Sequence, residues 1–141
     1  MRILAIDLGR RRVGLAVSDP EERFALPLTV LERRDDRTLW ENLRAVAAAE
    51  GVEMVVVGEP RRLDGSAGDA ARRSREFAER VPTMLGLPVA LVDEALTSNE
   101  AERRLGSNTS RRMAARTKQR LDAVAAQVLL EDFLAQRARP S

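Results

Sequence analysis

Acidic residues at three places in the chain lie where a carboxylate is expected to approach buried structure. Asp7 ends a run of apolar residues, and Asp93 and Glu94 follow a second apolar run. Asp122 shares a helical stripe with the apolar residues that follow it in the chain. A carboxylate in such a place is costly unless it is paired, protonated or bound to a metal ion. Asp7, Glu94 and Asp122 are therefore the candidate catalytic residues, with Asp93 as an alternative to Glu94.

Ordinary structural roles are the alternative for each of these acids. Asp7 could cap a loop amide or pair with the basic triplet 10–12, and the acids at 93 and 94 could open the helix that follows them. Asp122 could be a buried acid satisfied by one arginine. Because successive strand residues face opposite sides, only one of Asp93 and Glu94 can face a given site. The residue types alone leave these alternatives open.

A cluster built only from carboxylates would suit one class of metal ion. Carboxylate oxygens favour Mg²⁺ or Mn²⁺ over zinc. Small alanines at 123, 125 and 126 would let the last helix lie close to a sheet and bring Asp122 toward the strand-end acids. Two such ions about 4 Å apart activate a water and stabilise the leaving oxygen of a phosphodiester. The predicted chemistry is phosphodiester hydrolysis with two Mg²⁺ or Mn²⁺ ions, held by Asp7, by Asp93 or Glu94, and by Asp122.

Several other mechanisms are excluded by residue types that the chain lacks. It contains no cysteine, histidine or tyrosine, so it has no cysteine nucleophile, no imidazole base and no histidine-ligated metal. Its one tryptophan and three phenylalanines are too scattered to form a base-stacking platform. Catalysis is left to carboxylates, hydroxyls, arginines, Lys118 or a metal ion.

Positive charge is concentrated in the segment 103–120. That segment holds seven cations and no acid, although the whole chain has a net charge of only +2. Such clustering is expected of a surface that contacts a phosphate backbone, and a solvated basic helix face with a loop is the alternative. The predicted nucleic-acid-binding residues, from this segment and two other basic stretches, are Arg10, Arg61, Arg62, Arg111, Arg112, Arg116, Lys118 and Arg120.

A glycine-rich loop, GEPRRLDGSAG (58–68), joins a predicted strand to a predicted helix. Its backbone amides, together with the positive end of the helix, could hold an anion, and Gly58, Gly65 and Ser66 are the predicted phosphate-loop residues. The loop lacks the Gly-Lys-Ser/Thr ending of a P-loop. A tight turn in which Ser66 caps the helix is the alternative.

The elements that must position these residues follow the order βββαβαβα. Three strands with short connections predict an antiparallel meander, with the third at an edge because it carries Pro27. Strands separated by helices predict parallel neighbours, and hence a mixed five-stranded α/β sheet flanked by helices. A short helix between Thr97 and Gly106 is also expected. The predicted strands are 2–7, 13–19, 24–31, 53–58 and 87–92, and the predicted helices are 38–50, 69–85 and 117–137.

The length of 141 residues suits one domain. We expect it to span 1–137, with 138–141 as a disordered tail. The apolar run at the N-terminus is too short for a signal peptide, and no later run is long enough to cross a membrane. The absence of cysteine fits a reducing compartment. A cytoplasmic protein without a membrane partner is expected.

Four ordered blocks of the sequence resemble the YqgF family, also called RuvX, of bacterial ribonuclease-H-like proteins. The blocks, which cover nearly the whole chain, are AIDLGRRRVGLAVSD (5–19), VVVGEPRRLDGSAG (55–68), PVALVDEALTS (88–98) and RLDAVAAQVLLEDFL (120–134). The resemblance implies a ribonuclease-H-like fold, with Asp7, Glu94 and Asp122 as catalytic acids, and a divalent-metal nuclease in the cytoplasm. It further implies a role either in 5′-end maturation of pre-16S rRNA, within ribosome biogenesis, or as a Holliday junction resolvase.

Two departures from the family pattern concern contacts with phosphate. Ala95 stands where the family usually has an arginine directly after the second acid. Glu59 replaces the more usual leucine in the glycine-rich loop and adds a negative charge near the expected phosphate path. Arg61, Arg62 or the cations of 103–120 would have to compensate. Neither departure touches the three acids.

The main prediction is an endonuclease that acts on structured RNA or branched DNA. A non-catalytic nucleic-acid-binding module with the same fold would instead bind in a salt-sensitive manner without cleaving. A phosphotransfer enzyme is disfavoured, because 141 residues leave no room for a two-lobed cleft. A resolvase would act as a homodimer, since it cuts two strands symmetrically. RNA and DNA present the same phosphate chemistry, so the sequence does not choose between them.

Overall fold

The computed structural model describes residues 1–59, 68–93 and 114–138, with the backbone alone for 114–122. Its centre is a five-stranded sheet in the order β3-β2-β1-β4-β5. The first three strands are antiparallel to one another, whereas β4 and β5 run parallel to β1. In chain order the elements are β1 (Arg2–Leu8), β2 (Arg12–Ser18), β3 (Ala25–Glu32), α1 (Asp36–Glu50), β4 (Val52–Glu59), α2 (Asp69–Leu85), β5 (Val89–Asp93) and α4 (Ala114–Ala138). The predicted mixed sheet, with β3 at an edge, is confirmed, and the predicted short helix near 97–106 lies outside the described residues.

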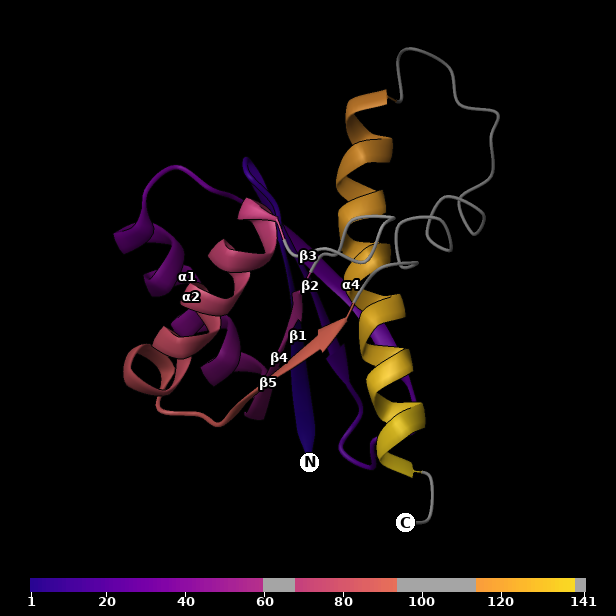
Figure 1. Cartoon of the computed structure of the whole chain (residues 1–141). Coiled ribbons are helices and arrows are strands. Elements are labelled where there is room, and N and C mark those ends of the chain that lie inside the picture. The colour runs from indigo at the N-terminus through magenta and orange to yellow at the C-terminus, as the bar shows by residue number, and fades with distance from the viewer. Residues whose placement is uncertain (60–67, 94–113, 139–141) are drawn as a thin grey trace.

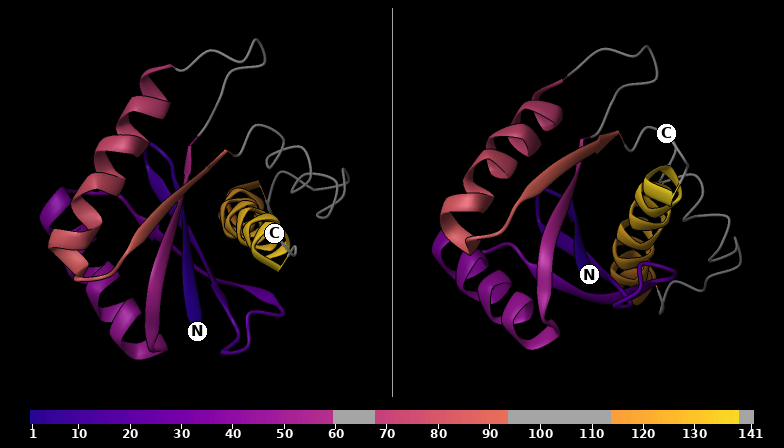
Figure 2. Two further views of the ribbon diagram at one scale, coloured as in Figure 1. Left: turned by 60° about the horizontal axis from the view of Figure 1, so that its bottom comes forward. Right: turned by 90° about the horizontal axis from the view of Figure 1, so that it is seen from below.

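Helices cover both faces of the sheet. Helices α1 and α2 lie on one face, and α4 crosses the other (Figures 1 and 2). Residues of β1 alternate between the two layers: Leu4 and Ile6 pack with α1 and α2, whereas Ile3 and Ala5 pack with α4. Because β1 is buried on both faces, its sequence is a continuous apolar run. The alternation also fixes the face of the sheet on which the residue at the end of the strand lies. None of the described helices is long and apolar enough to cross a membrane.

Helix α4 packs on β1, β2 and β3 through a surface that includes small residues. Ala123, Ala125 and Ala126 are buried there, as the sequence predicts for a helix that lies close to a sheet. The side-chain amide of Gln127 also donates to the carbonyl oxygen of Ala25 at 3.0 Å, which ties α4 to β3. The helix is therefore attached to the antiparallel half of the sheet.

The ends of α1 and α2 are set by different devices. Asp35 caps α1: its carboxylate accepts from the amide of Thr38 at 2.8 Å and from the Thr38 hydroxyl at 3.0 Å. The helix therefore begins two residues before the predicted start, and Gly51, with φ of 64°, ends it as expected. The N-cap of α2 is Gly68, without a side-chain cap. Ser66, the alternative cap for this helix, lies outside the described residues.

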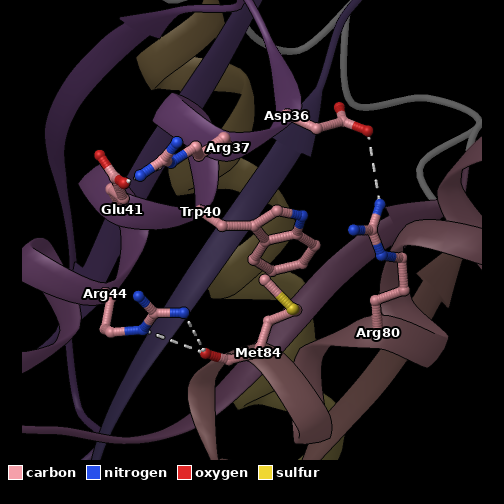
Figure 3. Close-up of a pocket in the computed structure, with 7 residues that line it drawn as sticks. All are labelled: Asp36, Arg37, Trp40, Glu41, Arg44, Arg80 and Met84. Carbon is pink, nitrogen blue, oxygen red and sulfur yellow. Dashed lines mark hydrogen bonds and ion pairs between the residues drawn. The ribbon is translucent and has the colours of Figure 1, made fainter.

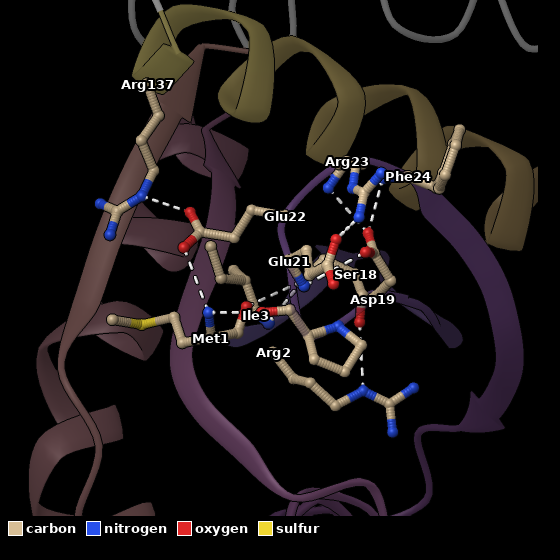
Figure 4. A network of polar contacts seen from close by, with 11 residues as sticks. Met1, Arg2, Ile3, Ser18, Asp19, Glu21, Glu22, Arg23, Phe24 and Arg137 are labelled. Carbon is tan, nitrogen blue, oxygen red and sulfur yellow. Dashed lines mark hydrogen bonds and ion pairs between the residues drawn. The ribbon is translucent and has the colours of Figure 1, made fainter.

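The turn between β2 and β3 lies at the end of the sheet where β1 begins (Figure 4). The carboxylate of Asp19 accepts hydrogen bonds from the amides of Arg23 and Phe24, both at 2.7 Å, and of Glu21 at 3.1 Å. Glu22 accepts from the guanidinium of Arg137, near the end of α4, at 2.6 Å. This turn thus joins the sheet to the far end of α4.

Candidate functional site

Asp7 is the next-to-last residue of β1 and is half-buried. It follows the alternation of Ile3 and Ala5, so it lies on the face that α4 covers. Its partner on β2 is Gly14, and Gly58 on β4 is the next position in register after the pair Ile6 and Val57. Both neighbours of Asp7 across the sheet therefore lack side chains. Neither neighbouring strand therefore places a side chain directly beside this carboxylate.

The end of β5 places the first of the two neighbouring acids, Asp93. Asp93 is in register with Glu59, and Val92 is in register with Gly58. Val92 packs in the core under α4, so Asp93 takes the opposite face, the one covered by α1 and α2. Asp93 and Asp7 therefore lie on different faces of the sheet. Glu94 itself lies outside the described residues and stays a prediction.

Asp122 belongs to α4, where the structure describes its backbone alone. It stands four residues before Ala126, which is fully buried against the sheet. In the part of the chain whose side chains are described, no three metal-ligating residues form a group. Two of the three predicted ligands fall outside that part. Asp7 is a hard oxygen donor of the kind that Mg²⁺ or Mn²⁺ takes, and the ligand set stays a prediction.

The predicted phosphate-binding residues are placed unevenly. Arg10 is exposed in the turn between β1 and β2 and, among the described residues, forms no ion pair, so it does not satisfy Asp7. Gly58 is buried near the end of β4, and Glu59 beside it is 9% exposed. Outside the described residues, or described by backbone alone, are Arg61, Arg62, Gly65, Ser66, Arg111, Arg112, Arg116, Lys118 and Arg120.

Arg33, between β3 and α1, is a residue that the sequence did not single out. Its backbone amide donates to the carbonyl oxygen of Arg11 at 2.7 Å. Its guanidinium donates to the carbonyl oxygen of Gly9 at 3.1 Å. Arg33 thus holds the turn that follows Asp7, and only contacts across the folded sheet disclose this.

A hollow of about 390 Å³ lies between α1 and α2 (Figure 3). Arg80 stacks over the ring of Trp40 at 5.4 Å and pairs with Asp36 at 3.4 Å. Arg44 donates to the carbonyl oxygen of Met84 at 3.1 Å. This hollow lies on the helical layer opposite the face of Asp7, so it is not part of the candidate catalytic site. Its lining residues are Asp36, Arg37, Trp40, Glu41, Arg44, Arg80 and Met84.

Comparison with known proteins identifies the family. The model of the RuvX family, described as Holliday junction resolvase, matches residues 1–136. The chain belongs to the RuvX family. A relative of this RuvX chain from Anaeromyxobacter sp. (strain K), named "Putative pre-16S rRNA nuclease", is 43% identical over 139 residues, which cover 98% of this chain and 99% of the relative. A relative of the same name from Opitutus terrae is 45% identical over 141 residues, which cover 99% and 95%.

Solved structures show the fold that RuvX shares. The structure of Thermus thermophilus RuvC has a TM-score of 0.56 at 15% identity and covers 97% of this chain and 96% of its own. The Fowlpox virus resolvase in complex with Holliday junction DNA has a TM-score of 0.59 at 9% identity and covers 99% and 100%. At these identities the likeness concerns the fold, and the predicted ribonuclease-H-like fold is confirmed.

Proposed function

We propose that this RuvX-family chain is a divalent-metal-dependent endonuclease that hydrolyses nucleic-acid phosphodiesters. The observation that carries the proposal is the placement of Asp7 near the end of the central strand, on the face of α4 and beside two glycine positions. A carboxylate so placed can serve a ligand while the neighbouring strands leave room for it. The nuclease names of full-length relatives support this chemistry.

Three acids would share the work at this site. Asp7 would supply oxygens from the sheet, Glu94 from the residue after Asp93, and Asp122 from α4, one turn before Ala126. Two Mg²⁺ or Mn²⁺ ions bound by such acids would activate a water and stabilise the leaving oxygen. The fold would hold these carboxylates in position, and the arginines of the chain would bind the phosphates of the substrate.

Maturation of the 5′ end of pre-16S rRNA is the substrate assignment that we favour. Relatives that are 43% and 45% identical over almost their whole length carry that name. Resolution of Holliday junctions is the second candidate, because the matching family model is described as a resolvase. A resolvase would need a homodimer to cut two strands symmetrically, whereas a nuclease that trims one RNA strand would not.

The test compares two Asp→Asn variants that make the same chemical change on opposite faces of the sheet. We expect Asp7→Asn to lower Mn²⁺-dependent cleavage of a pre-16S leader RNA by roughly 10²–10³-fold, the loss that follows removal of one electrostatic catalytic contact. Asp93→Asn, on the other face, is expected to retain activity. A four-way DNA junction assayed in parallel separates the two substrates. Wild-type cleavage by Asp7→Asn, or an equal loss in both variants, would overturn the assignment.

A further inference from the structure

The turn between β1 and β2 follows Asp7 directly and is tightly closed. The amide of Gly9 donates to the carbonyl oxygen of Arg12 at 3.0 Å, so Arg10 and Arg11 form the tip of the hairpin. A β-carbon at Gly9 would lie 2.5 Å from that same oxygen, closer than real side chains approach. The turn therefore depends on a glycine at this position, and its tip residues are fixed relative to β1.

Arg33 holds the tip from the neighbouring strand. It donates to the carbonyl oxygens of Arg11 and Gly9, at 2.7 Å and 3.1 Å, from its amide and its guanidinium respectively. These two bonds extend the pairing between β2 and β3 beyond the last ladder pair, Arg12 with Glu32. A tip that is ordered before a ligand arrives loses little conformational entropy when the ligand binds.

The two arginines at the tip carry positive charge that no described residue neutralises. Arg10 and Arg11 are both exposed, and neither forms an ion pair with any other residue that the structure describes. The carboxylates of the following connection are already engaged. Glu32 pairs with Arg34 at 3.2 Å, Asp35 caps Thr38 at 2.8 Å, and Asp36 pairs with Arg80 at 3.4 Å. The tip therefore presents two cations on a backbone that hydrogen bonds hold in place.

We propose that this tip, Arg10 and Arg11 held by Arg33, binds the phosphate backbone of the substrate on one side of the cleaved bond. The inference rests on the proposed nuclease function. Arg10 is three residues beyond Asp7 in the chain, at the tip of the turn that follows β1. One strand of duplex advances about 3.4 Å per phosphate, so phosphates contacted this close to Asp7 lie within a few nucleotides of the scissile one. Arginine suits this role because its planar fork binds phosphate oxygens through two donors.

Salt dependence of binding tests the contact directly. Each phosphate contact contributes about 0.9 to the slope of log K against log salt on duplex and about 0.7 on single strands. We expect Arg10→Gln/Arg11→Gln, measured in the Asp7→Asn background, to reduce the slope by about twice those values. In the otherwise wild-type protein the same pair should raise KM and leave kcat nearly unchanged. The matched control is Arg23→Gln/Arg44→Gln, which removes the same charge from the turn after β2 and from α1, away from the turn after Asp7, and should leave the slope unaltered.

Uncharged linkages in the substrate locate the contact. A single methylphosphonate is placed in turn at each nucleotide near the cleavage point. At the contacted position it should weaken binding by the wild-type protein but not by Arg10→Gln/Arg11→Gln. Arg33→Met should raise KM in the wild-type background and have no further effect in the double variant, since the turn then presents no cations. An equal effect in both backgrounds would show that Arg33 acts on folding alone and would overturn its positioning role.

The outcomes separate this inference from the proposed function. An unaltered salt slope in Arg10→Gln/Arg11→Gln, alongside cleavage that depends on Asp7, would overturn the contact and leave the nuclease assignment standing. A reduced slope without cleavage of either substrate by the wild-type protein would support the contact and overturn the nuclease assignment.

Discussion

Asp19 and Asp35 are carboxylates that the surrounding backbone holds in the ionised form. Hydrogen bonds from the amide of Phe24, and further from that of Arg23, lower the pKa of Asp19, and hydrogen bonds from the amide and hydroxyl of Thr38 lower the pKa of Asp35. Both side chains determine the local path of the backbone: Asp19 shapes the turn after β2, and Asp35 caps the start of α1. Each therefore links a protonation state to a piece of structure.

The contribution of Asp35 to stability should depend on pH. Because the folded pKa of Asp35 lies below its ordinary value of 3.8, its stabilising effect is complete above that value and is lost as the pH falls through the folded pKa. Asp35→Ala should therefore lower the Tm by roughly a few degrees at pH 7, with the gap to wild type closing on acidification. Thermal melts from pH 7 to pH 2 measure this.

Asp35→Asn provides the control for that prediction. Asparagine keeps an oxygen acceptor at the N-cap but does not titrate in this range, so its Tm at pH 7 should stay close to that of wild type. A gap between Asp35→Ala and wild type that persists unchanged at the lowest pH would contradict the assigned role of the ionised carboxylate.

Most elements could be predicted from the sequence, because their apolar periodicity is local. The five strands and three described helices lie close to their predicted ranges, and Asp7 could be singled out because it ends one of them. The start of α1 was missed because Asp35 extends it, and the face of the sheet on which Asp93 lies required the register of β4 with β5. Arg33 was missed because its partner, Gly9, is 24 residues away and nothing in the local pattern joins them.

Gly51 and Gly9 are required for different physical reasons, and substitutions at the two positions should distinguish a positive φ from a lack of space. Gly51 ends α1 with φ of 64° and open space around it, whereas Gly9 closes the first hairpin where a β-carbon has no room. Gly51→Ala should cost about 1–2 kcal/mol, and Gly51→Asn less, since asparagine tolerates the left-handed region. Gly9→Ala and Gly9→Asn should both cost about 1–3 kcal/mol by strain. Urea titrations measure the free energy of unfolding of all four variants. A Gly9→Asn variant clearly more stable than Gly9→Ala would contradict a steric requirement at this position.

At the scale of the whole molecule, Glu22 connects three distant parts of the chain. It pairs with Arg137 at 2.6 Å and with the amino group of Met1 at 3.2 Å (Figure 4). Burial raises the pKa of Glu22, but the hydrogen bonds and charges of these two partners outweigh it, so the pKa is lowered overall. Glu22 also adopts φ of 59°, which a residue other than glycine holds only where its surroundings impose it. The end of α4 is thus anchored by polar contacts as well as by its apolar face.

Loss of this anchor should loosen one end of α4 without unfolding the sheet. We expect Glu22→Gln to speed amide hydrogen exchange in the last turns of α4, while β1 and β4 exchange as in wild type. The effect on global stability should be small, about 0.2–1 kcal/mol, because the ion pairs are partly exposed. Asp132→Asn, on the same helix and exposed, is the control. Uniform acceleration across the sheet would show instead that Glu22 supports the whole fold.

The alternation of β1 has a consequence for how the chain tolerates changes of length. Asp7 reaches the face of α4 because an even number of steps separates it from Ile3 and Ala5, which pack on that face. Adding or deleting one residue between Ala5 and Asp7 would reverse this parity and turn the carboxylate toward α1 and α2, whereas a change of two would restore it. Divergent members of this family should therefore differ in length outside this stretch far more readily than within it.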